Sequence, residues 1–377
     1  MPPSAKTPST QATLTSTDDS GTPGPTMAGT ELCEAVRLLP FFDHHAHLLA
    51  HPSAGYRLEE VLTESPGSVP QTPDSLTWLR AQRDLGGGPA TARDLLDRCR
   101  FEAMLVDDGY RFPGAMTIAE HAATVGCPVE RVLRIETVAE DAAADWPPWG
   151  GVRERFRESV TTGLSAGAAA LKTIAAYRCG LDLPPPDNRD AAAAYRRWRR
   201  RGGRLDEAEL VSWFLAEALD VLRSDPRPLQ VHTGIGDADL SLPRADPALL
   251  GPLLSDPRNA SIPVVALHCY PFVRQASWLA SVHANAFVDL SLALTLAPHR
   301  GADLVLEALD LATASKVLVA TDATKLPEAF YLAARWCRDA VAGALGRLVA
   351  TTALDEATAV DWAGMLLAGN ARRIYRP

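Results

Sequence analysis

The chain has 377 residues, of which 47% are hydrophobic and 22% charged, and its formal net charge is −9 at pH 7. This length suits one large domain or two modest ones, and no apolar stretch is long enough to cross a bilayer. The acidic balance argues against nucleic acid or an anionic membrane surface as a partner, because binding to phosphates requires a positively charged surface.

We expect residues 1–30 to form a disordered tail, since "MPPSAKTPSTQATLTSTDDSGTPGPT" is rich in Pro, Ser and Thr. The stretch lacks the apolar core of a secretory signal, and Met27 is a second candidate for the start. The six cysteines are scattered without a C-x-x-C pair, which is typical of reduced thiols. These features predict a cytoplasmic protein.

Residues 31–377 alternate apolar strands with helical stretches. We predict strands at residues 38–47, 101–110, 129–137, 166–177, 227–234, 261–270, 285–293 and 315–323. Strands that alternate with helices pair in parallel through right-handed crossovers, and eight such repeats favour a closed (β/α)8 TIM barrel. An open, doubly wound sheet is the alternative fold.

Two segments are longer than an ordinary connection and predict helical insertions, at about residues 49–100 and 181–205. Each follows a predicted strand, so both should lie at the C-terminal face of the barrel, where active sites are found. Either insertion is a candidate lid. The basic run "RRWRRRGGR" at 196–204 is best explained as a solvated helix end.

The stretch "FFDHHAHL" places three of the nine histidines within four positions. Residues two apart on a strand share a face, so His45 and His47 should point together towards the barrel mouth and His44 should point away. On this reading, replacing His45 or His47 with Ala removes metal and activity, whereas His44→Ala retains both. An H-x-H pair alone is weak evidence for a metal site.

Further residues with metal-binding chemistry stand near the ends of other predicted strands: Lys172, His232, His268 and Asp322. Singly, such a histidine is often a hydrogen-bonded structural residue, and such an aspartate often caps the next helix. In a barrel, however, all the strand ends meet at one mouth. The combined set therefore predicts a metal site.

This ligand pattern resembles that of the amidohydrolase superfamily. The phrases "LKTIAAYRCGL", "LQVHTGIGDADL", "LHCYPFVRQASWLA", "AFVDLSLA" and "VATDATKLPE" resemble one branch, the amidohydrolase module found alone or fused to glutamine synthetase-like domains in FluG and nodulin-type proteins. The resemblance covers about residues 36–377, and the glutamine synthetase-like part is not in this sequence.

The resemblance implies a site for one or two divalent metal ions, with zinc as the first candidate and manganese or iron as alternatives. The implied ligands are His45, His47, Lys172, His232, His268 and Asp322. Asp322 would move the proton of the attacking water, and His268 would polarise a carbonyl or orient its neighbours. Whether Lys172 carries a carbamate that bridges two ions or is an ammonium that binds an anionic substrate stays open.

Three residues are candidates for substrate binding: Arg178, whose guanidinium suits a carboxylate, Tyr177 and Asp289. Tyr177 is equally explained as a packed aromatic and Asp289 as a structural acceptor. We expect a small-molecule substrate and leave self-association open. Hydrolysis of an amide or another C–N or C–O bond, with a γ-glutamyl amide as one candidate, is favoured over nonoxidative decarboxylation and over a noncatalytic ligand-binding barrel.

Overall fold

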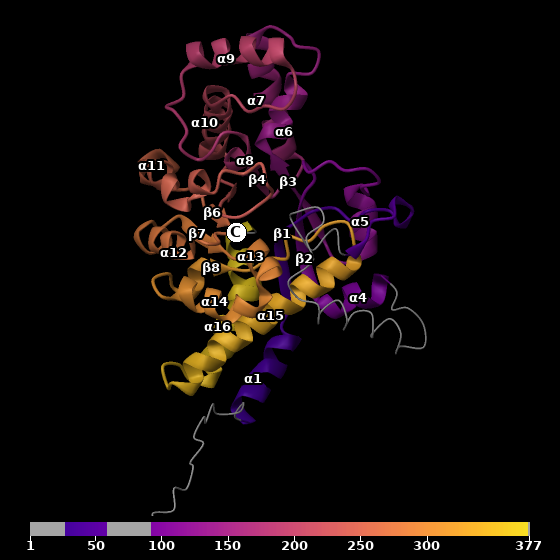
Figure 1. The fold of residues 1–377 in the computed structure, drawn as a ribbon, viewed down its shortest axis with the longest axis vertical. Coiled ribbons are helices and arrows are strands. Elements are labelled where there is room, and N and C mark those ends of the chain that lie inside the picture. The colour runs from indigo at the N-terminus through magenta and orange to yellow at the C-terminus, as the bar shows by residue number, and fades with distance from the viewer. Residues whose placement is uncertain (1–26, 59–91, 376–377) are drawn as a thin grey trace, which may run out of the picture.

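The computed structural model describes residues 27–58 and 92–375, which form a barrel of eight parallel strands surrounded by helices (Figure 1). The strands neighbour one another in chain order. They are β1 (Phe41–Ala46), β2 (Phe101–Asp107), β3 (Val129–Arg134), β4 (Ala170–Thr173), β5 (Leu229–His232), β6 (Val264–Leu267), β7 (Ala286–Asp289) and β8 (Val317–Leu318). The predicted TIM barrel is therefore confirmed, and every strand lies within its predicted segment.

The barrel closes between β1 and the segment that follows β8. Asp322 N donates to the carbonyl of His45 (3.0 Å), and His47 N donates to the carbonyl of Ala323 (2.8 Å). Further along, Lys325 N donates to the carbonyl of Leu48 (2.9 Å). The residues that follow β8 are thus fixed beside the histidines of β1.

Helices connect the strands and cover the outside of the barrel (Figure 1). They are α1 (Met27–Leu38), α4 (Ala92–Cys99), α5 (Ile118–Val125), α6 (Ile135–Ala142), α7 (Trp149–Ser165), α8 (Ala175–Arg178), α9 (Asn188–Arg201), α10 (Ala208–Ser224), α11 (Gly251–Ser255), α12 (Val273–Val282), α13 (Ser291–Leu296), α14 (Gly301–Leu309), α15 (Pro327–Ala350), α16 (Glu356–Gly364), the π-helix η7 (Met365–Gly369) and α17 (Asn370–Tyr375). Short 3-10 turns lie at η1 (Pro52–Ala54), η2 (Leu242–Ala245), η3 (Pro247–Leu250), η4 (Pro257–Asn259), η5 (Pro298–Arg300) and η6 (Ala314–Lys316). Within the described ranges, every helix is too short or too polar to span a lipid bilayer.

The interior of the barrel is filled by apolar side chains from the strands and from the C-terminal helices. Phe42, Leu105 and Leu267 belong to one buried cluster with Ile374 and Tyr375 of α17. The Tyr375 hydroxyl accepts a hydrogen bond from Gln230 Nε2 (3.0 Å) on β5. Side chains of several strands and of α17 pack in this one cluster. The C-terminal helix therefore fills one end of the barrel interior.

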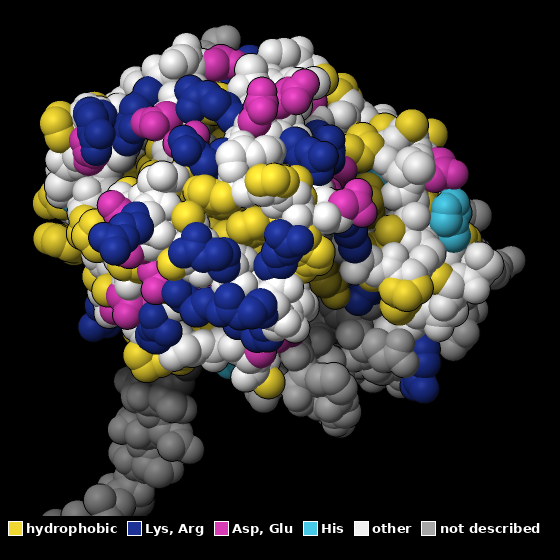
Figure 2. Space-filling model, turned by 90° about the horizontal axis from the view of Figure 1, so that it is seen from above, with side chains coloured by type: hydrophobic (Ala, Val, Ile, Leu, Met, Phe, Trp, Pro, Cys, Tyr) yellow, Lys and Arg dark blue, Asp and Glu magenta, His cyan; other side chains and the backbone are white. Residues whose placement is uncertain are grey.

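The second predicted insertion contains α9, which Figure 1 shows at the end of the molecule farthest from α1. Three prolines precede Asp187, whose side chain caps the helix by accepting hydrogen bonds from Arg189 N and Asp190 N. Figure 2, a view onto this end, shows Lys and Arg side chains interspersed with acidic and apolar ones. Several arginines of the basic run have carboxylate partners: Arg197 contacts Glu207 and Glu209, Arg201 contacts Asp206 and Glu207, and Arg204 contacts Asp239.

Parts of two predicted segments lie outside the described residues. Of the predicted tail at 1–30, the structure describes only residues from Met27, where α1 begins. Of the predicted insertion at 49–100, it describes residues 49–58 and 92–100.

Candidate metal centre

The three histidines at the end of β1, His44, His45 and His47, do not follow simple strand alternation. Asp43 pairs with Met104 of β2 and Ala46 pairs with Val106, so β1 carries one extra residue between these pairs. Such a bulge turns successive side chains out of the regular pattern. The sequence predicts that His44 points away from the mouth that His45 and His47 face. His44 is fully buried inside the barrel, where its Nε2 lies 3.1 Å from Asp289 Oδ1 on β7 and its ring stacks on Tyr375.

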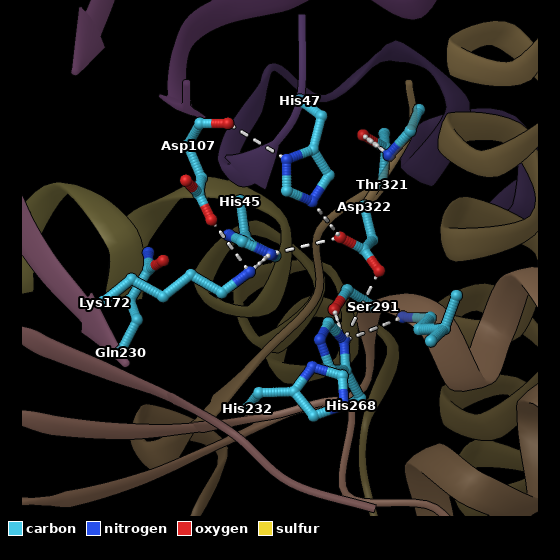
Figure 3. Close-up of polar contacts among 12 residues, drawn as sticks. His45, His47, Asp107, Lys172, Gln230, His232, His268, Ser291, Thr321 and Asp322 are labelled. Atoms are coloured by element: carbon cyan, nitrogen blue, oxygen red, sulfur yellow. Dashed lines mark hydrogen bonds and ion pairs between the residues drawn. The ribbon is translucent and has the colours of Figure 1, made fainter. Parts of the chain in front are cut away.

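His45 and His47 lie on either side of one carboxylate oxygen (Figure 3). Asp322 Oδ1 is 3.1 Å from His45 Nε2 and 3.4 Å from His47 Nε2. The other ring nitrogen of His47, Nδ1, is oriented by the backbone carbonyl of Asp107 at 3.0 Å. A histidine ligand is commonly held in this way by a carbonyl on its second nitrogen, so Nε2 of His47 is the atom presented to the centre.

Asp322 is positioned by its neighbours in the chain. Thr321 donates to the Asp43 carboxylate through its backbone N (2.9 Å) and through Oγ1 (2.5 Å), and Ala323 N donates to Thr321 Oγ1 (3.1 Å). Asp322 itself has a left-handed backbone with φ of 49°. Non-glycine residues in this region are uncommon and concentrate at functional sites, where surrounding contacts hold them.

His268, directly after β6, also has a left-handed backbone, with φ of 68°. Its N donates to Asp289 Oδ2 (3.1 Å), and its Nδ1 lies 2.7 Å from Ser291 Oγ. The Ser291 hydroxyl donates its hydrogen to Asp289 Oδ2 (2.5 Å), so Ser291 Oγ can only accept a hydrogen bond from His268 Nδ1. The Leu292 N–H also faces His268 Nδ1, but at the longer distance of 3.4 Å. This arrangement favours a proton on Nδ1 of His268 and leaves Nε2 with a free lone pair.

Lys172 belongs to the same cluster and is paired with Asp107, which is not among the residues predicted from the sequence. Its Nζ lies 3.1 Å from Asp107 Oδ2 and 3.0 Å from His45 Nε2. Asp107 also accepts from Arg134 Nη2 (2.7 Å) and Nε (3.0 Å). Asp107 ends the apolar stretch "FEAMLVD" in the same manner as Asp322 ends "LVATD", which is the signal that could have identified it.

Two more of the predicted residues, His232 and Tyr177, pack beside this cluster. His232 packs against His268, with ring centroids 4.5 Å apart, but its Nε2 lies 3.1 Å from the carbonyl of Ile235. Tyr177 packs on His232 with centroids 4.4 Å apart, and its hydroxyl accepts a hydrogen bond from Asp237 N. The structure thus places Tyr177 beside the site, next to a candidate ligand.

Two of the residues predicted to bind substrate are already committed to protein partners. Arg178 Nη1 lies 2.9 Å from Glu140 Oε1 and donates to the carbonyl of Leu205, so it links α6 to the end of the second insertion. Asp289 is fully buried and accepts from His268 and Ser291. These contacts agree with the alternative interpretation of Asp289, as a structural hydrogen-bond acceptor.

The electrostatics of the cluster suit a cation. Burial and the nearby Lys172 lower the pKa of His45 to about 4, and burial lowers the pKa of His232 to about 3. Although burial alone would raise the pKa of Asp322, the surrounding His268, His45 and His47 hold it well below its ordinary value. At neutral pH the imidazoles of His45 and His232 are therefore neutral, with lone pairs available, and the carboxylate of Asp322 is ionised.

The atoms that converge here fit a divalent ion. His45, His268 and Asp322 each offer a ligand atom, and these atoms lie within 4.8 Å of one another. Asp322 Oδ1, which lies near the Nε2 atoms of His45 and His47, is buried without a hydrogen-bond partner among the described residues. Buried polar atoms are normally satisfied, and nitrogen with oxygen donors is the set that zinc prefers. The Lys172 ammonium contacts the same His45 nitrogen that would bind the ion, so the positive charge of Lys172 and that of an ion compete there.

The chain is similar to known proteins over most of its length. The curated protein FluG from Emericella nidulans is 26% identical over 399 residues, which cover 90% of this chain and 46% of FluG, so the chain spans about half the length of that relative. The crystal structure of a candidate metal-dependent hydrolase from Lactobacillus casei is 29% identical with a TM-score of 0.84, over 91% of this chain and 97% of that one. No family model matches the chain.

A uronate isomerase from Thermotoga maritima shares the fold, with a TM-score of 0.62 at 12% identity over 92% of this chain and 97% of that one. At this identity the similarity concerns the fold alone. Together with the convergent histidines and Asp322, the comparisons confirm the resemblance predicted from the sequence: the chain is similar to part of FluG, and it shares the fold of a candidate metal-dependent hydrolase.

Proposed function

We propose that this protein is a metal-dependent hydrolase that cleaves an amide, or another C–N or C–O bond, of a small carboxylate-bearing molecule, with a γ-glutamyl amide as the first candidate. The observation that carries the proposal is the contact of His45 and His47 with one oxygen of Asp322 at 3.1 and 3.4 Å. The similarity to FluG and to a candidate hydrolase supports the class of reaction.

The chain supplies the proton chemistry for such a reaction. One or two zinc ions held by His45, His47, His268 and Asp322, with His232 and Lys172 beside them, would polarise the scissile carbonyl and acidify a water molecule. Asp322, ionised and only 10% exposed, is placed to accept the proton of the attacking water and return it to the leaving group. The Ser291 and Asp289 contacts hold His268 in one orientation while this happens.

The chemical state of Lys172 bears on the number of ions, because a carbamate on its side chain would bridge two ions whereas an ammonium would not. Burial lowers the pKa of Lys172, although Asp107 opposes this effect. A lower pKa increases the fraction of neutral amine, which is the form that reacts with carbon dioxide to give a carbamate. Intact-protein mass measured with and without bicarbonate, on wild type and Lys172→Met, tests this: a bicarbonate-dependent adduct confined to the wild type supports a bridging carbamate.

The function is tested by metal analysis and turnover together. We expect protein purified without chelators to contain divalent metal, and chelated protein to regain hydrolysis of γ-glutamyl amides, N-acyl amino acids or lactones when zinc, manganese or iron is returned. His45→Ala and His47→Ala should lose metal and nearly all turnover. His299→Ala is the matched control, because His299 is an exposed histidine in the short turn η5 and is not one of these ligands.

Each alternative gives a different result. Release of carbon dioxide from an aromatic acid, without hydrolysis, would identify a decarboxylase. Protein that carries no divalent metal and gains no turnover from any of the three metals would refute the hydrolase proposal.

A further inference from the structure

A second cluster lies next to His47 and is not used by the proposed reaction. The Tyr110 ring, in the loop after β2, packs edge-on against the His47 ring with centroids 5.2 Å apart. Phe112 follows at 5.5 Å from Tyr110, and Tyr56 at 5.9 Å from Phe112. These aromatic side chains extend from the metal centre to the exposed surface, where Tyr110 is 38% exposed.

A lysine stands over these rings. The Lys325 Nζ lies 5.0 Å from the ring centroid of Tyr56 and 5.4 Å from those of Tyr110 and Phe112. Aromatic faces attract an ammonium by their quadrupole and so hold its position while it keeps its charge. Lys325 Nζ also donates one hydrogen bond to the Tyr110 hydroxyl at 3.4 Å. An ammonium has three donors, so two remain for another acceptor.

The backbone of Lys325 is fixed by the barrel itself. Lys325 N donates to the carbonyl of Leu48 (2.9 Å), and Ala50 N donates to the carbonyl of Lys325 (2.8 Å). Its φ of 66° lies in the left-handed region, which is costly for a residue with a side chain. Lys325 is three residues after Asp322, and neighbouring backbone bonds to the segment 45–50 fix the main chain of both residues.

Other cations around the barrel mouth have carboxylate partners, whereas Lys325 has none among the described residues. Arg178 is paired with Glu140, and both Arg134 and Lys172 with Asp107. Lys325 contacts aromatic rings and a hydroxyl instead. A carboxylate that reached it would gain a charge-assisted hydrogen bond without displacing an existing ion pair.

We propose that Lys325, with Tyr110 beside it, forms a binding site for a carboxylate of the substrate, taking the role that the sequence suggested for Arg178. The site would accept a short molecule with two ends: a carbonyl at the metal centre and a carboxylate on Lys325, with the connecting carbon atoms against the Tyr110 ring. This inference rests on the proposed hydrolase function and narrows its substrate to molecules with a second, remote carboxylate.

The test uses two probes of similar size on the zinc-loaded protein. Glutarate has two carboxylates, and glutaramate replaces one of them with a neutral amide. Calorimetric titration should show that the wild type binds glutarate about tenfold more tightly, the ratio expected for one charge-assisted hydrogen bond in a partly exposed site. Lys325→Met should abolish this preference, and Lys325→Arg should retain part of it.

Lys316→Met is the matched control, because it removes one lysine from just before β8, at the opposite end of the strand, where Lys316 also lies over an aromatic ring. It should keep the preference for glutarate. Zinc content and thermal unfolding of every variant show whether a loss is local. If Lys325→Met keeps the wild-type preference, or if the wild type does not distinguish the two probes, the proposed site is refuted.

The outcomes separate this site from the proposed function. Hydrolysis of a γ-glutamyl amide whose KM does not change in Lys325→Met would uphold the hydrolase and refute the carboxylate site. A glutarate preference that depends on Lys325, in a protein that hydrolyses none of the amides, would uphold the site and refute the hydrolase. If both are correct, Lys325→Met raises KM for a γ-glutamyl amide about tenfold with little change in kcat.

Discussion

Replacing Asp107 with Asn should strongly destabilise the metal-free protein, because it leaves two buried cations without their counterion. Asp107 is fully buried and contacts Arg134 at 2.7 Å and Lys172 at 3.1 Å. The side chains of Arg134 and Lys172 are only 10% and 3% exposed. Removing one partner of a buried ion pair costs about 3–5 kcal/mol, a large part of the stability of a typical domain.

The magnitude can be measured by urea unfolding of the metal-free protein at pH 7. Asp108→Asn is the matched control: Asp108 is the next residue, but its partner Arg131 is 49% exposed, so its loss should cost less than about 1 kcal/mol. The double variant Asp107→Asn/Lys172→Met no longer contains one of the two unpaired cations. Its loss of unfolding free energy should therefore be smaller than the sum of the losses in the two single variants, by about 0.5–3 kcal/mol.

The same pair predicts a pH dependence. The pKa of Asp107 lies well below its ordinary value because, although burial opposes this, Arg134, Lys172 and His47 stabilise the ionised form. A carboxyl whose pKa is lower in the folded state stabilises the fold above its unfolded pKa of about 3.9, and this stabilisation is lost as the pH falls further. The difference in unfolding free energy between the wild type and Asp107→Asn should therefore have its largest value at pH 7 and decrease below about pH 4. A loss under about 1 kcal/mol at pH 7, equal to that of Asp108→Asn, would refute the reasoning.

Three further variants test other parts of the site. Asp322→Asn keeps the shape of the side chain but removes its charge, so turnover should fall roughly 10²–10⁴-fold without loss of the fold, as measured by single-turnover kinetics and circular dichroism; a smaller fall would exclude Asp322 as the proton acceptor. His44→Ala removes the contact to Asp289 inside the barrel, so thermal unfolding should reveal a loss of about 1–3 kcal/mol; an unchanged midpoint would show that this buried pair contributes nothing. Burial lowers the pKa of His121 to about 4 from about 6.5, so the folded state is stable with His121 neutral above pH 6.5, and about 2 kcal/mol of unfolding free energy is lost by pH 5. In His121→Gln the unfolding free energy should fall less between pH 7 and pH 5, by that amount. An equal fall in the two proteins would contradict the assignment.

The positions of the strands and most of the site could be read from the sequence because the relevant signals are local. An apolar, β-branched run predicts a strand wherever it packs, and in a parallel barrel every strand presents its carboxyl end to the same mouth. The place of His45, His268 and Asp322 within their own segments was therefore enough to predict that they meet, and the structure brings them together.

What the sequence could not determine depends on contacts between distant segments. The extra residue in β1 shows only in its pairing with β2, and the contact of His44 with Asp289 joins residues 245 positions apart. Arg178 has the chemistry to bind a substrate carboxylate, but Glu140 on another helix neutralises it. Periodicity reports which face a side chain takes in a regular strand, whereas bulges and long-range ion pairs are set by the packing of the whole barrel.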